Sequence, residues 1–306
     1  MDKATGSAPS AVRTKRPPVI GHIPTERDRL SSIFDVDERL AATRLEPADE
    51  FPKFLARCPI FLPVQREAQR ELLDTDNAMR FEYTDGSGRR HGPAVSIDDE
   101  DTLLALLRLR QMSLRAPGAL LPIPQATSRT VHEVQALCCS IGEIGQVLGT
   151  QSGGLNNRVR VQSLQRLTAV RIELAPHSAD ASGARSDFKL IEVRWDRFAD
   201  RGQLYVQFTP AVTRMLVDSS VPLDLEVRRQ LTSTGKAIHR YLCGQPKSYC
   251  IAADTLRRRI GYLRSIGSFT RDLRDSLARL KSLSWLRSYE IDGTGRRCPF
   301  NLRIRR

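Results

Sequence analysis

Residues 254–283 read DTLRRRIGYLRSIGSFTRDLRDSLARLKSL, and they carry the clearest indication of the fold. They predict a short helix over residues 254–262, which Asp254 caps, and a longer helix over residues 269–283. Residues 264–268 form the turn between the two helices. The first helix is expected to turn three apolar side chains inward: Leu256, Ile260 and Leu263. Two helices joined by a tight turn that contains glycine are typical of a helix-turn-helix.

A β-hairpin is predicted directly after the long helix. Its strands cover residues 285–291 and 298–304, and residues 292–295, Asp-Gly-Thr-Gly, supply the turn between them. Apolar and polar side chains alternate along residues 300–305, as in a half-buried strand. Residues 249–251 predict a strand before the two helices. A helix-turn-helix followed by a hairpin is the order of elements in a winged helix.

The same order of elements occurs earlier in the chain. Ser140 and Glu143 have the spacing of a capping box, and they open a helix that ends near Leu148. A glycine-rich break follows at residues 149–154, and a second helix covers residues 156–168. Strands are predicted after it at residues 170–174, 188–191 and 203–208. Before it, strands are predicted at residues 58–62, 80–83 and 131–134, and a helix at residues 96–109.

The long helices of the two units align without gaps. Four residues have the same spacing in both units. Leu164, Arg166, Leu167 and Val170 of the first correspond to Leu277, Arg279, Leu280 and Leu283 of the second. Together with the repeated order of elements, this match indicates two copies of one domain.

We therefore expect an α+β fold with two tandem winged-helix domains after a disordered N-terminal tail. The tail covers residues 1–50, where prolines alternate with charged and small residues. The first domain covers residues 51–218, and the second covers residues 219–306. There is no apolar run of about 18 residues that could span a membrane, and residues 1–16 lack the apolar middle of a secretion signal. A cytoplasmic location is expected.

Positive charge is concentrated at one end of the chain. The formal net charge of the 306 residues is +13. Residues 221–306 hold 19 Lys and Arg against 7 Asp and Glu, a net charge of +12, which leaves +1 for the rest of the chain. Because this segment also has periodic apolar residues, we interpret it as a folded domain and not as a solvated tail. A domain with such a charge is suited to bind a polyanion, and we expect double-stranded DNA.

The long helix of the second domain has an apolar side and a polar side. The apolar side holds Phe269, Leu273, Leu277 and Leu280. The candidate DNA-binding residues of this domain are Thr270, Arg271, Arg274, Asp275, Ala278 and Lys281 on this helix, Arg258 on the helix before it, and Arg296 and Arg297 at the hairpin tip. In the major groove, Arg reads guanine and Asp can accept a hydrogen bond from cytosine. Arg271, Asp275 and Arg279 also have the spacing of surface ion pairs, and that alternative stays open.

The equivalent helix of the first domain has a weaker DNA-binding pattern. The candidate residues that are expected to face outward are Arg158, Gln162, Gln165 and Arg166. Gln and Arg can read bases, but any solvated helix can carry them. The near-zero charge of this part of the chain indicates weaker DNA contact or a protein interface. Self-association through the first domain is therefore expected.

The sequence offers no catalytic, metal-binding or cofactor-binding pattern. The four successive acids at residues 98–101 are explained by the positive end of a helix dipole. The six cysteines form no C-x-x-C pair, and Cys138 and Cys139 are expected to fill space in a helix. No phosphate-binding loop occurs, and the five histidines are scattered, with His239 expected to be packed in the core. We expect neither an enzyme nor a bound metal or cofactor.

Several stretches resemble the replication initiators of plasmids. The first is Gly202-Gln203-Leu204-Tyr205-Val206 with Thr209-Pro210-Ala211-Val212, the second is residues 233–244 with Ala237-Ile238-His239-Arg240-Tyr241-Leu242-Cys243-Gly244, and the third is residues 254–285. Phe81-Glu82-Tyr83 and residues 98–107 are also similar to the family's opening strand and helix. The chain resembles the RepC-type initiators of IncQ-like plasmids and, more distantly, the TrfA-type initiators of IncP plasmids. The resemblance covers residues 50–306.

This resemblance implies tandem winged helices that bind directly repeated origin sequences, called iterons. It also implies that the protein helps to open the adjacent AT-rich duplex and to load a replicative helicase. The alternative that uses the same fold is a transcriptional repressor of a plasmid or mobile-element promoter. An array of direct repeats beside the gene would favour the initiator, and a single palindrome would favour the repressor.

Overall fold

The computed structural model describes residues 50–64, 79–83, 86–114, 120–126, 131–151, 153–176, 186–195, 203–293 and 300–306. Up to residue 218 the elements are β1 (Glu50–Pro52), α2 (Lys53–Arg57), β2 (Phe61–Leu62), β3 (Met79–Tyr83), β4 (Gly86–His91), β5 (Val95–Ser96), α4 (Ile97–Leu114), β6 (Leu120–Ala126), β7 (Val131–Ser140), α5 (Ile141–Val147), α6 (Gly154–Ala169), β8 (Arg171–Pro176), β9 (Ser186–Lys189), β10 (Ile191–Trp195), β11 (Gln203–Phe208) and α7 (Pro210–Asp218). From there the elements are β12 (Ser220–Pro222), α8 (Leu225–Arg229), α9 (Ser233–Cys243), β13 (Ser248–Ala252), α10 (Ala253–Arg259), α11 (Ile266–Ser282), β14 (Ser288–Asp292) and β15 (Asn301–Arg305). The fold is mixed α+β, as expected. The expected disorder of residues 1–49 falls outside the described residues.

The C-terminal part of the chain is a winged helix. Helices α9, α10 and α11 pack against an antiparallel sheet with the strand order β13-β15-β14. Thr232 caps α9 by accepting a hydrogen bond from the amide of Gly235, and Ser265 caps α11 in the same way through the amide of Ser268. The apolar side of α11 is fully buried against the other helices, and its residues are Phe269, Leu273, Leu277 and Leu280.

Three local predictions in this domain are wrong. Helix α10 begins at Ala253, and Asp254 pairs with Arg257 instead of capping the helix. Helix α11 begins at Ile266, because the side chain of Ser265 accepts a hydrogen bond from the amide of Ser268 and caps the helix earlier than predicted. Leu263 does not point inward, since its exposed fraction is 57%, because the chain has already left α10 at this point.

The N-terminal part contains a second helix-turn-helix and hairpin in the same order. Helices α5 and α6 follow α4, and β8 pairs with β9 after them. The predicted capping box is confirmed, since Ser140 accepts from the amide of Glu143 and the Glu143 carboxylate accepts from the amide of Ser140. Two four-stranded sheets extend this domain, with the orders β3-β4-β8-β9 and β10-β11-β7-β6. The prediction that Cys138 and Cys139 lie in a helix is wrong, because both belong to strand β7.

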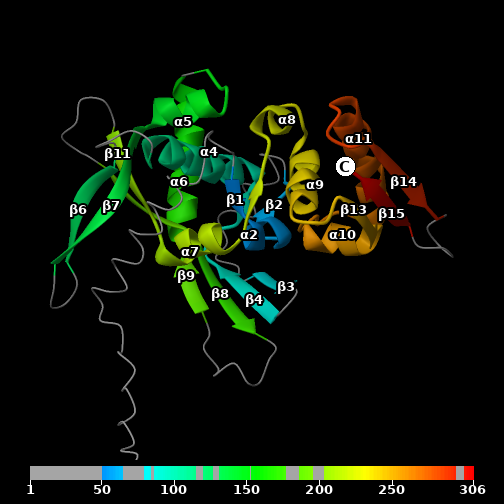
Figure 1. Ribbon diagram of the computed structural model, residues 1–306, viewed down its shortest axis with the longest axis horizontal. Helices are drawn as coiled ribbons and strands as arrows, with labels where there is room; N and C mark the ends of the chain where they lie inside the picture. Colours follow the sequence, from blue (N-terminus) through cyan, green and yellow to red (C-terminus); the bar gives the residue numbers. More distant parts are fainter. Residues whose placement is uncertain are drawn as a thin grey trace, which may run out of the picture.

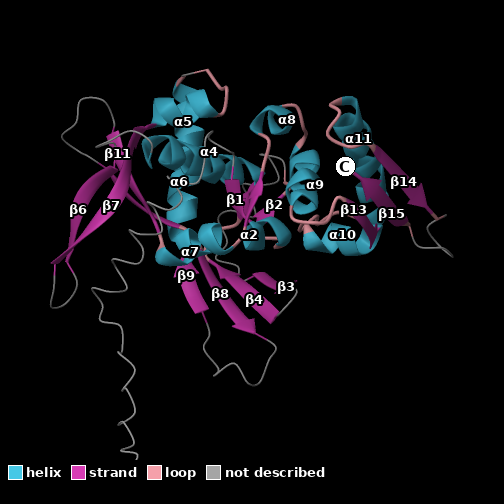
Figure 2. Cartoon of the chain, in the orientation of Figure 1, coloured by secondary structure: helices cyan, strands magenta, loops and turns pink. Residues whose placement is uncertain are grey.

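Short elements connect the two winged helices in the middle of the molecule (Figure 1). Strand β1 pairs with β12, so the chain that enters the first domain lies beside the chain that leaves it. Phe51 and Leu55 are fully buried there and belong to one apolar core that runs through both domains. The larger sheets lie at the periphery, with the helices between them (Figure 2). The division of the chain at residue 218 stays a prediction.

The acids at the start of α4 form a buried ion-pair network with the C-terminal part of the chain. Glu100 contacts Arg240 at 2.5 Å and Arg228 at 3.0 Å. Asp101 contacts Arg228 at 2.7 Å and Lys236 at 2.6 Å. The side chains of Glu100, Arg228 and Arg240 are at most 1% exposed. The helix dipole alone therefore does not explain these acids, because two of them hold α4 to α8 and α9.

Charge pairing outweighs burial in this network. Burial by itself would raise the pKa of Asp101, but the neighbouring Arg228 and Lys236 lower it below its usual value. In the same way, burial would lower the pKa of Arg228, but Glu100 and Asp101 raise it. Both groups are therefore charged in the folded protein at neutral pH. Removal of one partner would leave an uncompensated charge in the interior.

We expect Asp101→Asn to lower the free energy of unfolding by about 3–5 kcal/mol, because Arg228 and Lys236 would lose a buried partner. The matched control is Asp218→Asn, since the pair of Asp218 with Arg214 is exposed and is expected to contribute at most about 1 kcal/mol. Urea denaturation of both variants measures the difference. Equal losses for the two variants would show that the network does not hold the domains together.

Candidate nucleic-acid interface

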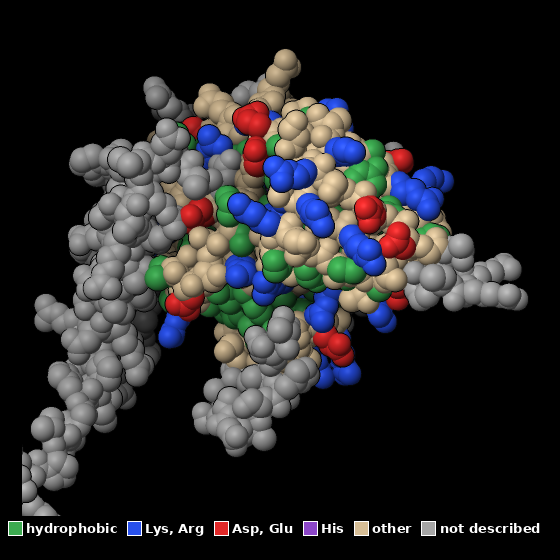
Figure 3. Space-filling view, turned by 45° about the vertical axis from the view of Figure 1, so that its right-hand side comes forward, with side chains coloured by type: hydrophobic (Ala, Val, Ile, Leu, Met, Phe, Trp, Pro, Cys, Tyr) green, Lys and Arg blue, Asp and Glu red, His purple; other side chains and the backbone are tan. Residues whose placement is uncertain are grey.

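Helix α11 presents an exposed basic face to solvent. The candidate residues that the structure places on this face are Arg271, Arg274, Asp275, Ala278 and Lys281. They lie opposite the buried apolar side, as the helical spacing predicts. Figure 3 turns the C-terminal domain forward and shows Lys and Arg side chains spread over this side of the molecule. The face has the length and charge to meet a polyanion.

The two flanks of this face have different neighbours. The guanidinium of Arg274 lies 5.7 Å from the centre of the Phe300 ring, next to β15, so a cation–π contact directs it toward the hairpin. On the other flank, Arg279 donates to the side-chain oxygen of Gln230 at 2.9 Å. Arg271 lies 3.7 Å from Asp272. No ion pair among the described residues joins Asp275 to Arg271 or Arg279, so the structure does not support the surface-pair alternative.

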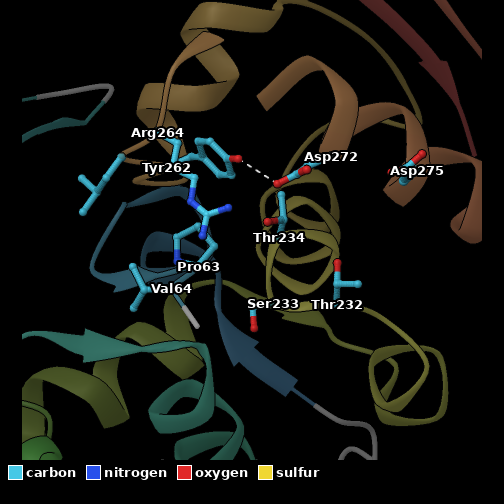
Figure 4. A pocket seen from close by; sticks show the side chains of 10 residues that line it. Pro63, Val64, Thr232, Ser233, Thr234, Tyr262, Arg264, Asp272 and Asp275 are labelled. Atoms are coloured by element: carbon cyan, nitrogen blue, oxygen red, sulfur yellow. Dashed lines mark hydrogen bonds between the residues drawn. The ribbon is translucent and has the colours of Figure 1, made fainter. Parts of the chain in front are cut away.

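The two acids of α11 differ in their surroundings (Figure 4). Asp272 accepts a 2.7 Å hydrogen bond from the hydroxyl of Tyr262 at the edge of a pocket between α9, α11 and the preceding turn. Asp275 lies farther along α11, apart from this pair, and is exposed. Asp272 therefore accepts a hydrogen bond within the protein, whereas the exposed carboxylate of Asp275 can accept hydrogen bonds from a ligand.

Not every candidate of the second domain lies on the exposed face. Thr270 is 4% exposed, and its hydroxyl donates to the carbonyl oxygen of Ile266, so the prediction that it binds DNA is wrong. Its position on α11, one residue after Phe269, turns it toward the core. The side chain of Arg258 on α10 is 68% exposed and lies 3.5 Å from Asp254. Arg296 and Arg297 lie outside the described residues.

In the first domain, α6 exposes only some of the expected residues. Arg158, Gln162 and Gln165 are exposed. Arg166 does not face outward, because its guanidinium makes hydrogen bonds to Asp99 on α4, the shortest of them 2.6 Å. The side chain of Asp99 is fully buried, so this pair holds α6 to α4. The prediction that Arg166 binds DNA is therefore wrong.

Three exposed apolar residues beside the two helix starts were not predicted from the sequence. The exposed fractions are 70% for Leu155 in the first turn of α6, 40% for Ile266 at the start of α11 and 57% for Leu263 just before it. A signal is present in the sequence for Leu155 alone, because it lies outside the periodic apolar stripe of α6 and adjoins a glycine, whereas Leu263 and Ile266 have the spacing of inward-facing residues. An apolar side chain at such a position can contact a thymine methyl group in the major groove.

The described residues contain no group of acids, histidines and cysteines that could hold a metal ion. His239 is packed in the core as predicted, with its ring centre 4.5 Å from that of Trp285. Burial, followed by the nearby Arg228 and Arg306, keeps the pKa of His239 well below its usual value. None of the helices in the described ranges has the length and apolarity to cross a membrane.

The fold is shared with domains 2 and 3 of RctB, a Vibrio chromosome II replication initiator with winged-helix domains. A crystal structure of selenomethionine derivatives of these domains superposes with a TM-score of 0.56 at 11% sequence identity, over 83% of this chain and 98% of that chain. A second crystal structure of RctB domains 2 and 3 gives a TM-score of 0.51 at 9% identity, over 83% of this chain and 96% of that chain. No family model and no curated protein sequence matches the chain.

This likeness confirms the expected tandem winged-helix fold. Both crystal structures contain domains of RctB, a replication initiator that is not an enzyme. The resemblance to the RepC-type and TrfA-type initiators stays an interpretation of the sequence.

We expect Arg166→Ala to destabilise the protein by about 3–5 kcal/mol, because Asp99 would remain buried without its partner. Arg158→Ala, at an exposed position of the same helix, should change the stability by at most about 0.5 kcal/mol. Thermal or urea unfolding measures both. A stable Arg166→Ala variant would show that Arg166 is not a structural residue.

We expect the stability to fall as the pH drops below about 6.5, the usual pKa of histidine in an unfolded chain. The unfolded state then binds a proton that the buried His239 does not bind, and this favours unfolding. His239→Phe keeps an aromatic ring against Trp285 and removes the titration. Urea unfolding between about pH 7 and pH 5 should therefore depend less on pH in the variant, and identical profiles would contradict the assignment.

Proposed function

We propose that this protein is a replication initiator that binds duplex DNA sequence-specifically, with α11 in the major groove. The exposed basic face of α11 carries this proposal. The likeness to RctB supports it, because that fold belongs to a replication initiator. A polar face with arginines, an acid and a small residue suits base reading better than it suits a protein interface, where Arg and large apolar residues would form a buried centre.

The dimensions of α11 fit this role. Its 17 residues span about 25 Å, and the major groove is about 12 Å wide, so about two turns of the helix can reach base edges. Arg271 at the N-terminal end of the face can read guanine, and Asp275 one turn later can accept from cytosine. Ala278 is small, which allows the helix to approach the bases closely. Ile266 enters the groove first and suits a thymine methyl group.

Helix α6 of the first domain is a second, weaker reading helix, which means a helix whose side chains contact base edges. Arg158, Gln162 and Gln165 of α6 supply donors and acceptors, and Leu155 supplies an apolar contact at the helix start. The buried network at the start of α4 holds α6 and α11 in one arrangement, so both helices would read segments with a constant spacing. Two unlike domains on one chain suit direct repeats, whereas a two-fold dimer suits inverted half-sites.

The finer steps of initiation are part of the same proposal. We infer that the protein binds direct repeats at a replication origin, helps to open the adjacent duplex, and brings in a replicative helicase. Self-association through the first domain would regulate the amount of binding-competent protein.

Footprinting of the full-length protein on the noncoding DNA beside its own gene tests this function. We expect protection of an array of direct repeats, one repeat for each bound chain. Protection of a single palindrome at the promoter would instead identify a repressor. No protected DNA at all would refute the proposed function.

On a protected repeat, we expect Arg271→Ala to weaken binding by about 1–3 kcal/mol and to relax discrimination at one base position. Arg274→Ala should have a similar effect at a neighbouring position, because the Phe300 ring directs this side chain. Arg214→Ala is the control, since Arg214 is exposed on α7 and belongs to neither reading helix. Binding to the repeat and to random DNA is compared by fluorescence anisotropy. Equal losses on both DNAs would show that these arginines only anchor phosphates.

A further inference from the structure

A basic groove of about 840 Å³ lies between the first domain and α10. One wall is the outer side of the β3–β4 hairpin, with Arg80 and Arg89. The other wall is α10, with Thr255 and Arg258. The groove residues include five arginines and one acid: Arg80, Arg89, Arg257, Arg258 and Arg259, with Glu82. Asp254 pairs with Arg257 and Arg258, so the five arginines face two acids and the groove is positive. None of its cations belongs to the network at the start of α4.

The hairpin wall places two like charges directly opposite each other. Arg80 and Arg89 are cross-strand partners in the antiparallel pair β3–β4, and both are exposed. Like charges in this position repel and destabilise a hairpin. Within the described part of the chain, neither guanidinium has an ion-pair or hydrogen-bond partner among the side chains. Arg89 also lies opposite Glu173 of β8, which offsets part of this repulsion. The two exposed guanidinium groups can both contact an anion in the groove.

Two close contacts join the second domain to the first beside the groove. Arg259 donates to the carbonyl oxygen of Glu82 at 2.6 Å, which joins α10 to β3. Gly261 has a φ of +73°, and a Cβ atom there would lie 2.8 Å from Leu62 of the first domain. Glycine is therefore required where the turn after α10 crosses the first domain. The groove is therefore present in the protein without a bound ligand.

The groove continues the DNA-binding face of α11. Its lining includes residues 261–263, the turn that leads directly into α11. In a helix-turn-helix, the helix before the recognition helix crosses the DNA backbone. Thr255 and Arg258 of α10 occupy that place. DNA that α11 holds would therefore extend past α10 toward Arg80 and Arg89.

The side chains that line the groove are suited to bind the sugar-phosphate backbone of a DNA duplex. Arginine donates to phosphate oxygens in a bidentate way. The two aromatic residues of the lining, Phe81 and Tyr262, are each only 5% exposed, so they offer no ring face on which the bases of a single strand could stack. We propose that this groove holds the sugar-phosphate backbone of the duplex beyond the segment that α11 reads. The inference rests on the proposed function, and it adds a second, sequence-independent site between the two domains.

The test uses the full-length protein and a fluorescein-labelled random-sequence duplex of about 40 base pairs, about four helical turns. The groove variant is Arg80→Ala with Arg89→Ala. The reading-helix variant is Arg271→Ala with Arg274→Ala, and the charge-matched control is Arg194→Ala with Arg214→Ala, two exposed arginines outside the groove. Binding is measured by anisotropy between about 50 and 200 mM salt.

We expect the groove variant to bind the duplex about tenfold more weakly and the control to bind within about twofold of the natural protein. The slope of log K against log salt should fall by about 0.9 for each phosphate that the variant no longer neutralises, so by about 1.8 for both arginines. The melting temperature of the groove variant should be unchanged or higher, because the like-charge repulsion is removed. Weaker binding then cannot arise from unfolding.

The possible outcomes separate this inference from the proposed function. If the natural protein binds the duplex and the groove variant matches the control, the groove inference is wrong and the proposed function stands. If the natural protein does not bind duplex DNA, both are wrong. A groove variant that loses affinity for a poly-dT strand or a poly-Glu peptide, but not for the duplex, would also overturn the inference.

Discussion

The arrangement of the two domains depends on the buried ion pairs between the start of α4 and helices α8 and α9. Glu100 and Asp101 pair with Arg228, Lys236 and Arg240, and the side chains of Glu100, Arg228 and Arg240 are almost completely removed from water. Loss of one partner would leave an uncompensated charge at this depth, which is strongly unfavourable. The pairs therefore determine which part of α4 lies against α8 and α9.

These buried ion pairs reduce the positive charge that the second domain presents at its surface. Residues 221–306 carry a net charge of +12, but three of their cations pair with two acids of the first domain. The positive charge that remains for DNA lies on α11, on α10 and in the groove beside β3 and β4. Among the described residues of the first domain, three acids and three arginines are buried, so burial leaves the balance of its surface charge unchanged. The second domain carries most of the net positive charge, and arginines of both domains line the groove.

A rigid arrangement also gives the two reading helices a constant separation. Under the proposed function, such a pair of helices would recognise two DNA segments at one spacing and in one relative orientation. The basic groove between the domains would hold the backbone that connects these segments. Affinity from phosphates and specificity from bases then come from different residues, as is general in protein–DNA recognition.

Local sequence patterns were sufficient to predict most of the elements and the fold class. The capping box of Ser140 and Glu143, the apolar stripe of α11 and the hairpin after it depend on neighbours within a few residues, so local pattern predicts them. The exposed candidates Arg271, Arg274 and Asp275 follow from the same helical period. Only the packing of the folded chain shows that Arg166 binds Asp99, that Glu100 and Asp101 join the domains, and that Arg80 and Arg89 face α10. The physical reason is that these contacts join side chains on separate elements far apart in the sequence, and no local period encodes such pairings.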